Sequence, residues 1–153
     1  MLRTIEFSVL GEPQGKGRPR FARRGAYVST YTPQKTKAYE KLIRDAFIDA
    51  ASKNLVKRYM FTGFVRVEIE AYFDVPKSVS KVKRDLLRAG EFCSKKPDGD
   101  NIIKVVLDAL NEIAYADDKN VIDIHVTKYY AKEFENPRIV VRLKGECEIV
   151  DVY

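Results

Sequence analysis

Two aspartates, Asp98 and Asp100, flank Gly99 directly after Pro97, where the apolar pattern that follows predicts the start of a helix. Pro97 keeps the chain extended before the helix, and Gly99 frees the backbone between the two carboxylates. Asp100 is well placed to cap the helix by accepting hydrogen bonds from its first backbone N–H groups, but capping does not explain Asp98. The spacing therefore leaves a carboxylate for chemistry.

A second acidic pair, Asp117-Asp118, follows the predicted end of this helix. A helix of about twelve residues is about 18 Å long, and a reversal at Tyr115-Ala116 would return Asp118 toward Asp98 and Asp100. Carboxylates drawn together at a helix N-terminus cost free energy unless a cation neutralises them. This pattern favours a divalent cation with oxygen ligands, Mg²⁺ or Mn²⁺, which would activate water and neutralise charge on a phosphodiester.

Lys104 lies one helical turn after Asp100, on the polar side of the same helix. In a metal-dependent reaction its ammonium group would stabilise developing negative charge or orient the attacking water. The spacing fits equally an ordinary solvated face, with an i,i+4 ion pair between Asp100 and Lys104. Both interpretations stay open on spacing alone, because acidic pairs are common and mostly solvated.

The elements that must position these residues follow from the hydrophobic pattern. Alternating residues predict strands over 4–10, 64–73, 121–130 and 138–143, and an extended aromatic stretch over 27–31. A break is expected at Thr62-Gly63, and the strand over 64–73 is expected to place Val65, Val67, Ile69 and Ala71 on one side. In the late strand Ile122, Ile124 and Val126 are expected to face inward. Helices are predicted from Pro33 to about 51, capped by Thr32, from Ser78 to 87, and from Asp100 to about 111.

Helical spacing also predicts which side chains these helices bury. The inner face of the first is expected to be Tyr39, Leu42, Ile43, Ala46, Phe47 and Ala50, and that of the third Ile102, Ile103, Val106, Leu107, Leu110 and Ile113. The order of elements predicts one small α+β (mixed α/β) domain over residues 1–153. We expect a mixed sheet flanked by helices, with antiparallel hairpins at its end.

The chain has 153 residues and a net charge of +6, but its charges are separated along the sequence. Residues 1–97 hold 21 Lys and Arg against 10 Asp and Glu, whereas residues 98–153 hold 7 against 12. A basic surface beside an acidic cluster suits a protein that holds a polyanion and a metal cation together. No apolar run is long enough for a membrane helix, and we expect a cytoplasmic protein.

Cysteine and histidine chemistry is largely excluded. Cys93 and Cys147 are far apart and lack metal-ligand spacing, which leaves two buried or idle thiols. The single histidine, His125, lies in a predicted strand and is expected to be a surface or hydrogen-bonded residue. Chemistry in this chain therefore rests on carboxylates and lysines.

Basic residues concentrate in a Gly- and Pro-rich segment that is predicted to be a loop from Gly11 through residue 24. No acid interrupts its five basic residues, for which we predict contacts with nucleic-acid phosphates: Lys16, Arg18, Arg20, Arg23 and Arg24. A second basic stretch includes Lys95 and Lys96, for which solvated lysines are nearly as good an explanation.

In this order, the motifs Lys96-Pro97-Asp98-Gly99-Asp100-Asn101 with Lys104, Leu107-Asp108-Ala109-Leu110-Asn111 and Tyr115-Ala116-Asp117-Asp118 resemble the RusA family of Holliday junction resolvases, endodeoxyribonucleases often carried by prophages. Gly11-Glu12-Pro13, Lys16 to Arg20, Tyr31-Thr32-Pro33 and Val75 to Ser78 extend the likeness over about residues 7–130. Two features depart from the family pattern: Gly99 replaces an aliphatic residue, and Phe92-Cys93-Ser94 lacks a histidine.

The resemblance implies a set of roles for this chain. Asp98, Asp100 and Asp118 become Mg²⁺ ligands, with Mn²⁺ as a substitute, and Lys104 becomes the catalytic lysine. The implied partner is four-way junction DNA, cut by a homodimer through paired symmetric nicks in recombination and repair. No organic cofactor and no membrane partner are expected.

Two other functions stay open. One is a less selective nuclease that acts on flaps or other DNA branches. The other is a non-catalytic DNA-binding protein of prophage origin, in which the acidic cluster is only a helix cap and an ion pair.

Overall fold

The structure is a computed structural model, and it describes residues 1–152. In chain order the elements are β1 (Leu2–Leu10), β2 (Arg20–Arg24), β3 (Tyr27–Tyr31), α1 (Gln34–Ala51), β4 (Lys57–Phe73), α2 (Lys81–Leu87), α3 (Gly99–Leu110), the 3-10 helix η1 (Asp118–Asn120), β5 (Val121–Tyr130) and β6 (Arg138–Asp151). The predicted α+β class is confirmed.

The main sheet has four strands in the order β1-β6-β4-β5. β4 and β5 run parallel, whereas β6 pairs antiparallel with both β1 and β4. The expected hairpin between the last two strands is wrong, because β6 crosses to the middle of the sheet. The crossing lets β6 fill both of its edges with hydrogen bonds while Ile139, Val141 and Leu143 are buried in the core.

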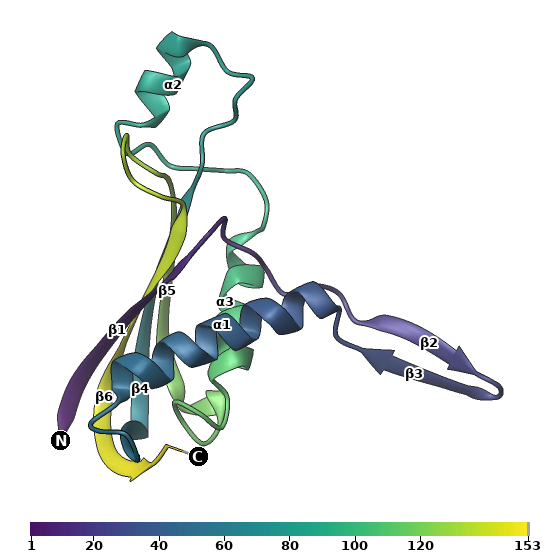
Figure 1. Ribbon diagram of the computed structural model, residues 1–153, viewed down its shortest axis with the longest axis vertical. Helices are drawn as coiled ribbons and strands as arrows, with labels where there is room; N and C mark the ends of the chain where they lie inside the picture. Colours follow the sequence, from purple (N-terminus) through teal and green to yellow (C-terminus); the bar gives the residue numbers. More distant parts are fainter. Residues whose placement is uncertain (153) are drawn as a thin grey trace.

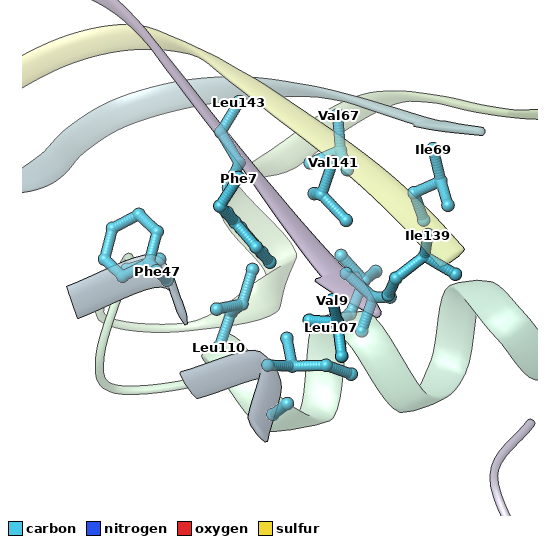
Figure 2. Packing of buried hydrophobic residues seen from close by; sticks show 14 of the residues in the cluster. Phe7, Val9, Phe47, Val67, Ile69, Leu107, Leu110, Ile139, Val141 and Leu143 are labelled. Atoms are coloured by element: carbon cyan, nitrogen blue, oxygen red, sulfur yellow. The ribbon is translucent and has the colours of Figure 1, made fainter. Parts of the chain in front are cut away.

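Helices α1 and α3 cover one face of this sheet, with the hydrophobic core between the layers (Figure 1). In Figure 2, Phe7 and Leu143 of the sheet lie near Phe47 of α1 and Leu110 of α3. The four residues that alternation placed on one side of β4 are all buried: Val65, Val67, Ile69 and Ala71.

The predicted helix faces need some corrections. In α1, Leu42 and Ala50 are exposed, because the contact stripe runs through Thr36, Tyr39, Ile43, Phe47 and Ala51 instead. In α3 the core side is Ile102, Val105, Val106, Leu107, Ala109 and Leu110, whereas Ile103 and Ile113 are only partly buried. In β5, Ile122 and Ile124 are exposed, because α3 covers the strand near Val126.

Several element boundaries also differ from the sequence prediction. β4 begins seven residues before position 64, and Gly63 lies at a register shift between Phe61 and Val65 rather than at a break. Pro33, not Thr32, occupies the N-cap position of α1. Ser80, not Ser78, caps α2, by accepting a hydrogen bond from the backbone N–H of Lys83.

Two elements project from the two-layer body (Figure 1). Residues 20–24, which were expected to be loop, form β2 and pair with β3 as a separate two-stranded hairpin. At another end of the molecule lies α2, which buries none of its residues.

On the face of the sheet opposite the helices, ion pairs join side chains of neighbouring strands. Arg142 lies at the centre of this face, with its Nε 2.6 Å from Glu6 Oε1, one terminal nitrogen 2.9 Å from Glu68 Oε1, and Glu70 also paired with it. His125 is exposed, as expected, and lies 3.0 Å from Asp123. These matched charges make this face a poor binder of polyanions.

Both cysteines are free and buried, as the sequence indicated. Among the described residues, none of the helices combines the length and the apolar character that a membrane span requires.

Candidate active site

Asp98 and Asp100 lie at the first turn of α3, and both are exposed. Asp98 is the N-cap residue, but its side chain makes no cap hydrogen bond. Within residues 1–152, neither carboxylate forms a salt bridge or accepts a hydrogen bond that would occupy it. The positive end of the helix dipole stabilises both negative charges. The sequence prediction that Asp100 is the cap is therefore wrong, and both carboxylates are available to a ligand.

Lys104 is exposed on the same side of α3. The alternative interpretation paired it with Asp100 across one helical turn, but no such ion pair occurs in the part of the chain that the structure describes. Its ammonium group is therefore free to approach a bound anion. Asp98, Asp100 and Lys104 are therefore all exposed in the N-terminal half of α3 and lack ion-pair partners among the described residues.

The Gly-rich loop before β2 packs tightly against this end of α3. Gly15 lies so close that an added Cβ atom would be 2.9 Å from both the Asn101 and Pro97 Cβ atoms. The backbone N–H of Lys16 donates to the carbonyl of Asn101 at 3.0 Å, and that of Gly17 donates to Thr36 Oγ1 at 3.1 Å. The loop therefore bridges the N-terminal parts of α1 and α3.

The side chain of Lys16 also connects the two helices, through ion pairs with Glu40 and Asp108. Its Nζ atom lies 3.2 Å from Glu40 Oε1 of α1 and 3.2 Å from Asp108 Oδ2 of α3, and the side chain is only 17% exposed. The sequence analysis predicted a phosphate contact for Lys16. The structure instead places its ammonium group between two helices, because two carboxylates converge on it where solvent is scarce.

A cleft of about 720 Å³ lies where the Gly-rich loop meets the starts of α1 and α3. Asp98 and Asn101 line it, together with the cationic side chains of Arg18, Arg20, Lys35 and Lys96. Four cations and a free carboxylate in one concave site suit a phosphate backbone held beside a metal-binding carboxylate.

Among the predicted DNA contacts, Arg18, Arg20 and Lys96 therefore line one cleft, while Arg23 and Arg24 lie farther along the exposed β2. Lys95 is partly occupied, because its Nζ lies 2.9 Å from Glu12 Oε1. Sequence reasoning missed Lys35. Its signal was its position in the first turn after Pro33, within a stretch that contains no acid.

Asp118 lies away from the cleft that Asp98 lines. Desolvation, then hydrogen bonding to Asp117 and the negative charge of Asp108, raise the pKa of the Asp118 carboxyl. In the strand that follows, Val126 packs against the start of α3, because its Cγ1 would lie 3.2 Å from a Cβ on Gly99. At about 3.3 Å per strand residue, Asp118 is left near the other end of the helix.

Tyr115 anchors the turn that follows α3 and precedes Asp118. It is fully buried, and its hydroxyl donates to the Leu107 carbonyl at 2.9 Å. Burial, followed by the charges of Asp118 and Asp108, raises the pKa of Tyr115, so the hydroxyl stays protonated and keeps donating. The acidic turn is therefore tied to the last turns of α3.

Comparison with known proteins adds an independent line of evidence. Residues 11–144 match the family described as Endodeoxyribonuclease RusA. The chain belongs to the RusA endodeoxyribonuclease family. A relative in Bacillus subtilis (strain 168), named "Uncharacterized protein YqaN", is 34% identical over 143 residues, which cover 92% of this chain and 95% of the relative. The resemblance of the sequence motifs to the RusA family is thereby confirmed.

The RusA family implies a metal ion, and the donor set of the cleft suits one. Mg²⁺ in proteins is bound by one or two carboxylates and completes its octahedral shell with water and substrate phosphates. Asp98 and Asp100 supply such oxygen atoms. Among residues 1–152, no three Asp, Glu, His or Cys side chains lie close enough together to form a metal site by themselves.

Proposed function

We propose that this protein is a Mg²⁺-dependent endonuclease that resolves four-way DNA junctions as a homodimer, with Mn²⁺ able to replace Mg²⁺. The observation that carries the proposal is Asp98, a carboxylate unpaired within residues 1–152, in a cleft with four cationic side chains, with the likewise unpaired Asp100 two residues further along the same helix. Membership in an endodeoxyribonuclease family supports the substrate class. A DNA substrate also agrees with a cytoplasmic protein.

The cleft residues and the neighbouring Asp100 and Lys104 have separate physical roles in this proposal. Arg18, Arg20 and Lys96 hold the phosphate backbone through charge, which gives affinity with little sequence information. Asp98 and Asp100 would hold the metal ion, which, when bound, supplies an activated water and neutralises phosphate charge. Lys104 stabilises negative charge that develops on the phosphate. The family resemblance implies products with 5′-phosphate and 3′-hydroxyl ends.

Asp118 is the point at which the family resemblance and the fold differ. The resemblance assigns it to the same metal ion, whereas its carboxyl neighbours in the fold are Asp117 and Asp108. An Asp118→Asn variant separates these roles. Loss of cleavage together with weaker Mg²⁺ binding supports ligation, whereas loss of cleavage at unchanged Mg²⁺ affinity places Asp118 outside the metal shell.

The homodimer, which the family resemblance implies, fits the symmetry of the substrate. A four-way junction has two-fold symmetry and must be nicked on two strands, so one active site per subunit suffices in a dimer. Sedimentation at micromolar protein, with and without junction, measures this directly. A monomer under both conditions would contradict this part of the proposal.

The central experiment compares cleavage of a labelled four-way junction with cleavage of a linear duplex of the same sequence, in Mg²⁺ or in EDTA. We expect paired symmetric nicks in the junction only, and none in EDTA or with the Asp98→Asn and Asp100→Asn variants. Asp49→Asn is the matched control, because Asp49 is another exposed helical aspartate, on α1.

The two alternative functions give different outcomes in the same assay. Cleavage of flaps as fast as junctions indicates a less selective branched-DNA nuclease. Tight junction binding without any cleavage in Mg²⁺ or Mn²⁺ indicates a non-catalytic DNA-binding protein. In that case Mg²⁺ should affect thermal stability only as general salt does, without saturation.

A further inference from the structure

The β2–β3 hairpin has no protein partner in the described residues 1–152 that would explain it. Its two strands pair only with each other, and the hairpin projects away from the two-layer body (Figure 1). All of its residues are exposed except Ala22, which is half-buried. An isolated two-stranded hairpin is only marginally stable in water. A surface outside this polypeptide chain is therefore expected to hold it.

One face of the hairpin has a regular chemical pattern. The strand register places Arg20 opposite Tyr31 and Arg24 opposite Tyr27, and directly opposite residues point to the same face. The pair between them consists of the small residues Ala22 and Ser29. The face therefore presents two arginine–tyrosine pairs about 13 Å apart along the strands.

The tip of the hairpin is narrow. The turn between β2 and β3 consists of Gly25 and Ala26, with Gly25 at a φ of 59°, a left-handed conformation that glycine adopts freely. No large side chain occupies the tip itself, so it is not built to force base pairs apart. A two-stranded ribbon does fit a DNA major groove, about 12 Å wide, but not a minor groove of about 6 Å.

The charge of the surrounding segment identifies DNA as the occupant. Residues 13–39 hold seven Lys and Arg and no Asp or Glu. The same segment runs continuously from the cleft, where Arg18 and Arg20 lie near Asp98, out to Arg24 at the tip. DNA bound in the cleft would therefore have its neighbouring duplex within reach of the hairpin.

We infer that the β2–β3 hairpin enters the major groove of one junction arm, with its Arg20, Arg24, Tyr27 and Tyr31 face against the duplex. This inference rests on the proposed function for the identity of the DNA. The arginines contact phosphates and base edges, and the tyrosines cover the sugar and base surfaces between them. Arg20 lies where the hairpin joins the cleft, whereas Arg24 and Tyr27 at the far end make a second contact, outside the cleavage site, that aligns the arm with Asp98.

The test uses the full-length protein in EDTA, so binding is measured whether or not the protein can cut. An Arg24→Ser variant, which leaves the cleft arginines Arg18 and Arg20 in place, is compared with Lys53→Ser, which removes the same charge from an exposed residue away from the hairpin. Loss of one phosphate contact should reduce the slope of log K against log salt by about 0.9 and weaken junction binding roughly 5-fold at about 150 mM salt. The control variant should bind as the wild type does.

Groove entry is measured by protection of guanine N7 from dimethyl sulfate, because this atom lies in the major groove. The wild type should protect guanines in one arm near the crossover, and the arginine variant should lose that protection. Unprotected guanines in the wild-type complex, or equal binding by the two variants, would overturn the inference. So would an arginine variant that sediments as a monomer beside a dimeric wild type, because the hairpin would then be a subunit contact.

Failure of this inference is distinguishable from failure of the proposed function. Junction cleavage by the wild type in Mg²⁺ without N7 protection removes only the hairpin assignment. N7 protection in EDTA without cleavage in any metal keeps the hairpin assignment and removes the nuclease.

Discussion

Gly15→Ala should slow cleavage far more than it lowers the melting temperature, because it displaces the start of α3 without unfolding the domain. A Cβ atom at this position would lie 2.9 Å from the Cβ atoms of Asn101 and Pro97. Carbon atoms in ordinary contact are about 3.5–4.0 Å apart, so the two segments must separate by roughly 1 Å. The hydrogen bond from Lys16 N–H to the Asn101 carbonyl, 3.0 Å long, lies in the path of this movement.

The displacement should fall on the start of α3 rather than on the loop. Lys16 is held by Glu40 and Asp108, and Gly17 by Thr36, so the loop cannot retreat freely. Overpacking of this kind costs about 1–3 kcal/mol, and about 1 kcal/mol lowers the melting temperature of a domain of this size by roughly 2–4 °C. A displacement of about 1 Å in a catalytic group costs up to about 100-fold in rate.

The measurement combines thermal unfolding with single-turnover cleavage of a four-way junction at saturating protein. Gly63→Ala is the matched control, because an added Cβ there meets no atom within 4 Å. We expect Gly15→Ala to melt a few degrees lower and to cleave many-fold more slowly, while the control changes neither quantity. If both variants melt and cleave alike, the tight contact between loop and helix does not position the carboxylates.

Three further predictions concern stability. Tyr115→Phe removes a buried donor to a backbone carbonyl and should lower the free energy of unfolding by about 1 kcal/mol in urea titrations; an unchanged midpoint would contradict this. The Tyr72 hydroxyl, followed by Arg142, holds the pKa of Glu70 below its usual range. The ionised Glu70 carboxylate therefore stabilises the fold at neutral pH, and this contribution is lost as pH falls through its lowered pKa. The difference in unfolding free energy between wild type and Glu70→Gln should shrink in acid. Burial raises the pKa of Cys147 to about 11, so the folded state favours the neutral thiol. The melting temperature of the wild type should therefore fall as pH rises from about 8.5, the pKa of a free thiol, to about 11. The fall should be smaller in Cys147→Ala, which has no thiol at this position.

Local spacing in the sequence determined a large part of this protein. Alternation identified the buried side of β4, and helical spacing identified the core side of α3 together with its exposed acids and Lys104. The motif order identified the family. These properties are local, because a side chain's direction relative to its neighbours follows from strand or helix geometry alone.

Only the tertiary structure decided where distant segments meet. β6 lies between β1 and β4, and Asp118 lies beside Asp108, because strand pairing over long separations sets the return path of the chain. The ion pairs of Lys16 also could not be predicted from its neighbours in the sequence, because Glu40 and Asp108 are remote along the chain. The sequence determined which side chains are available for chemistry, whereas the packing of α1, α3 and the sheet decided which of them share a site, because distances across the fold depend on contacts between remote residues.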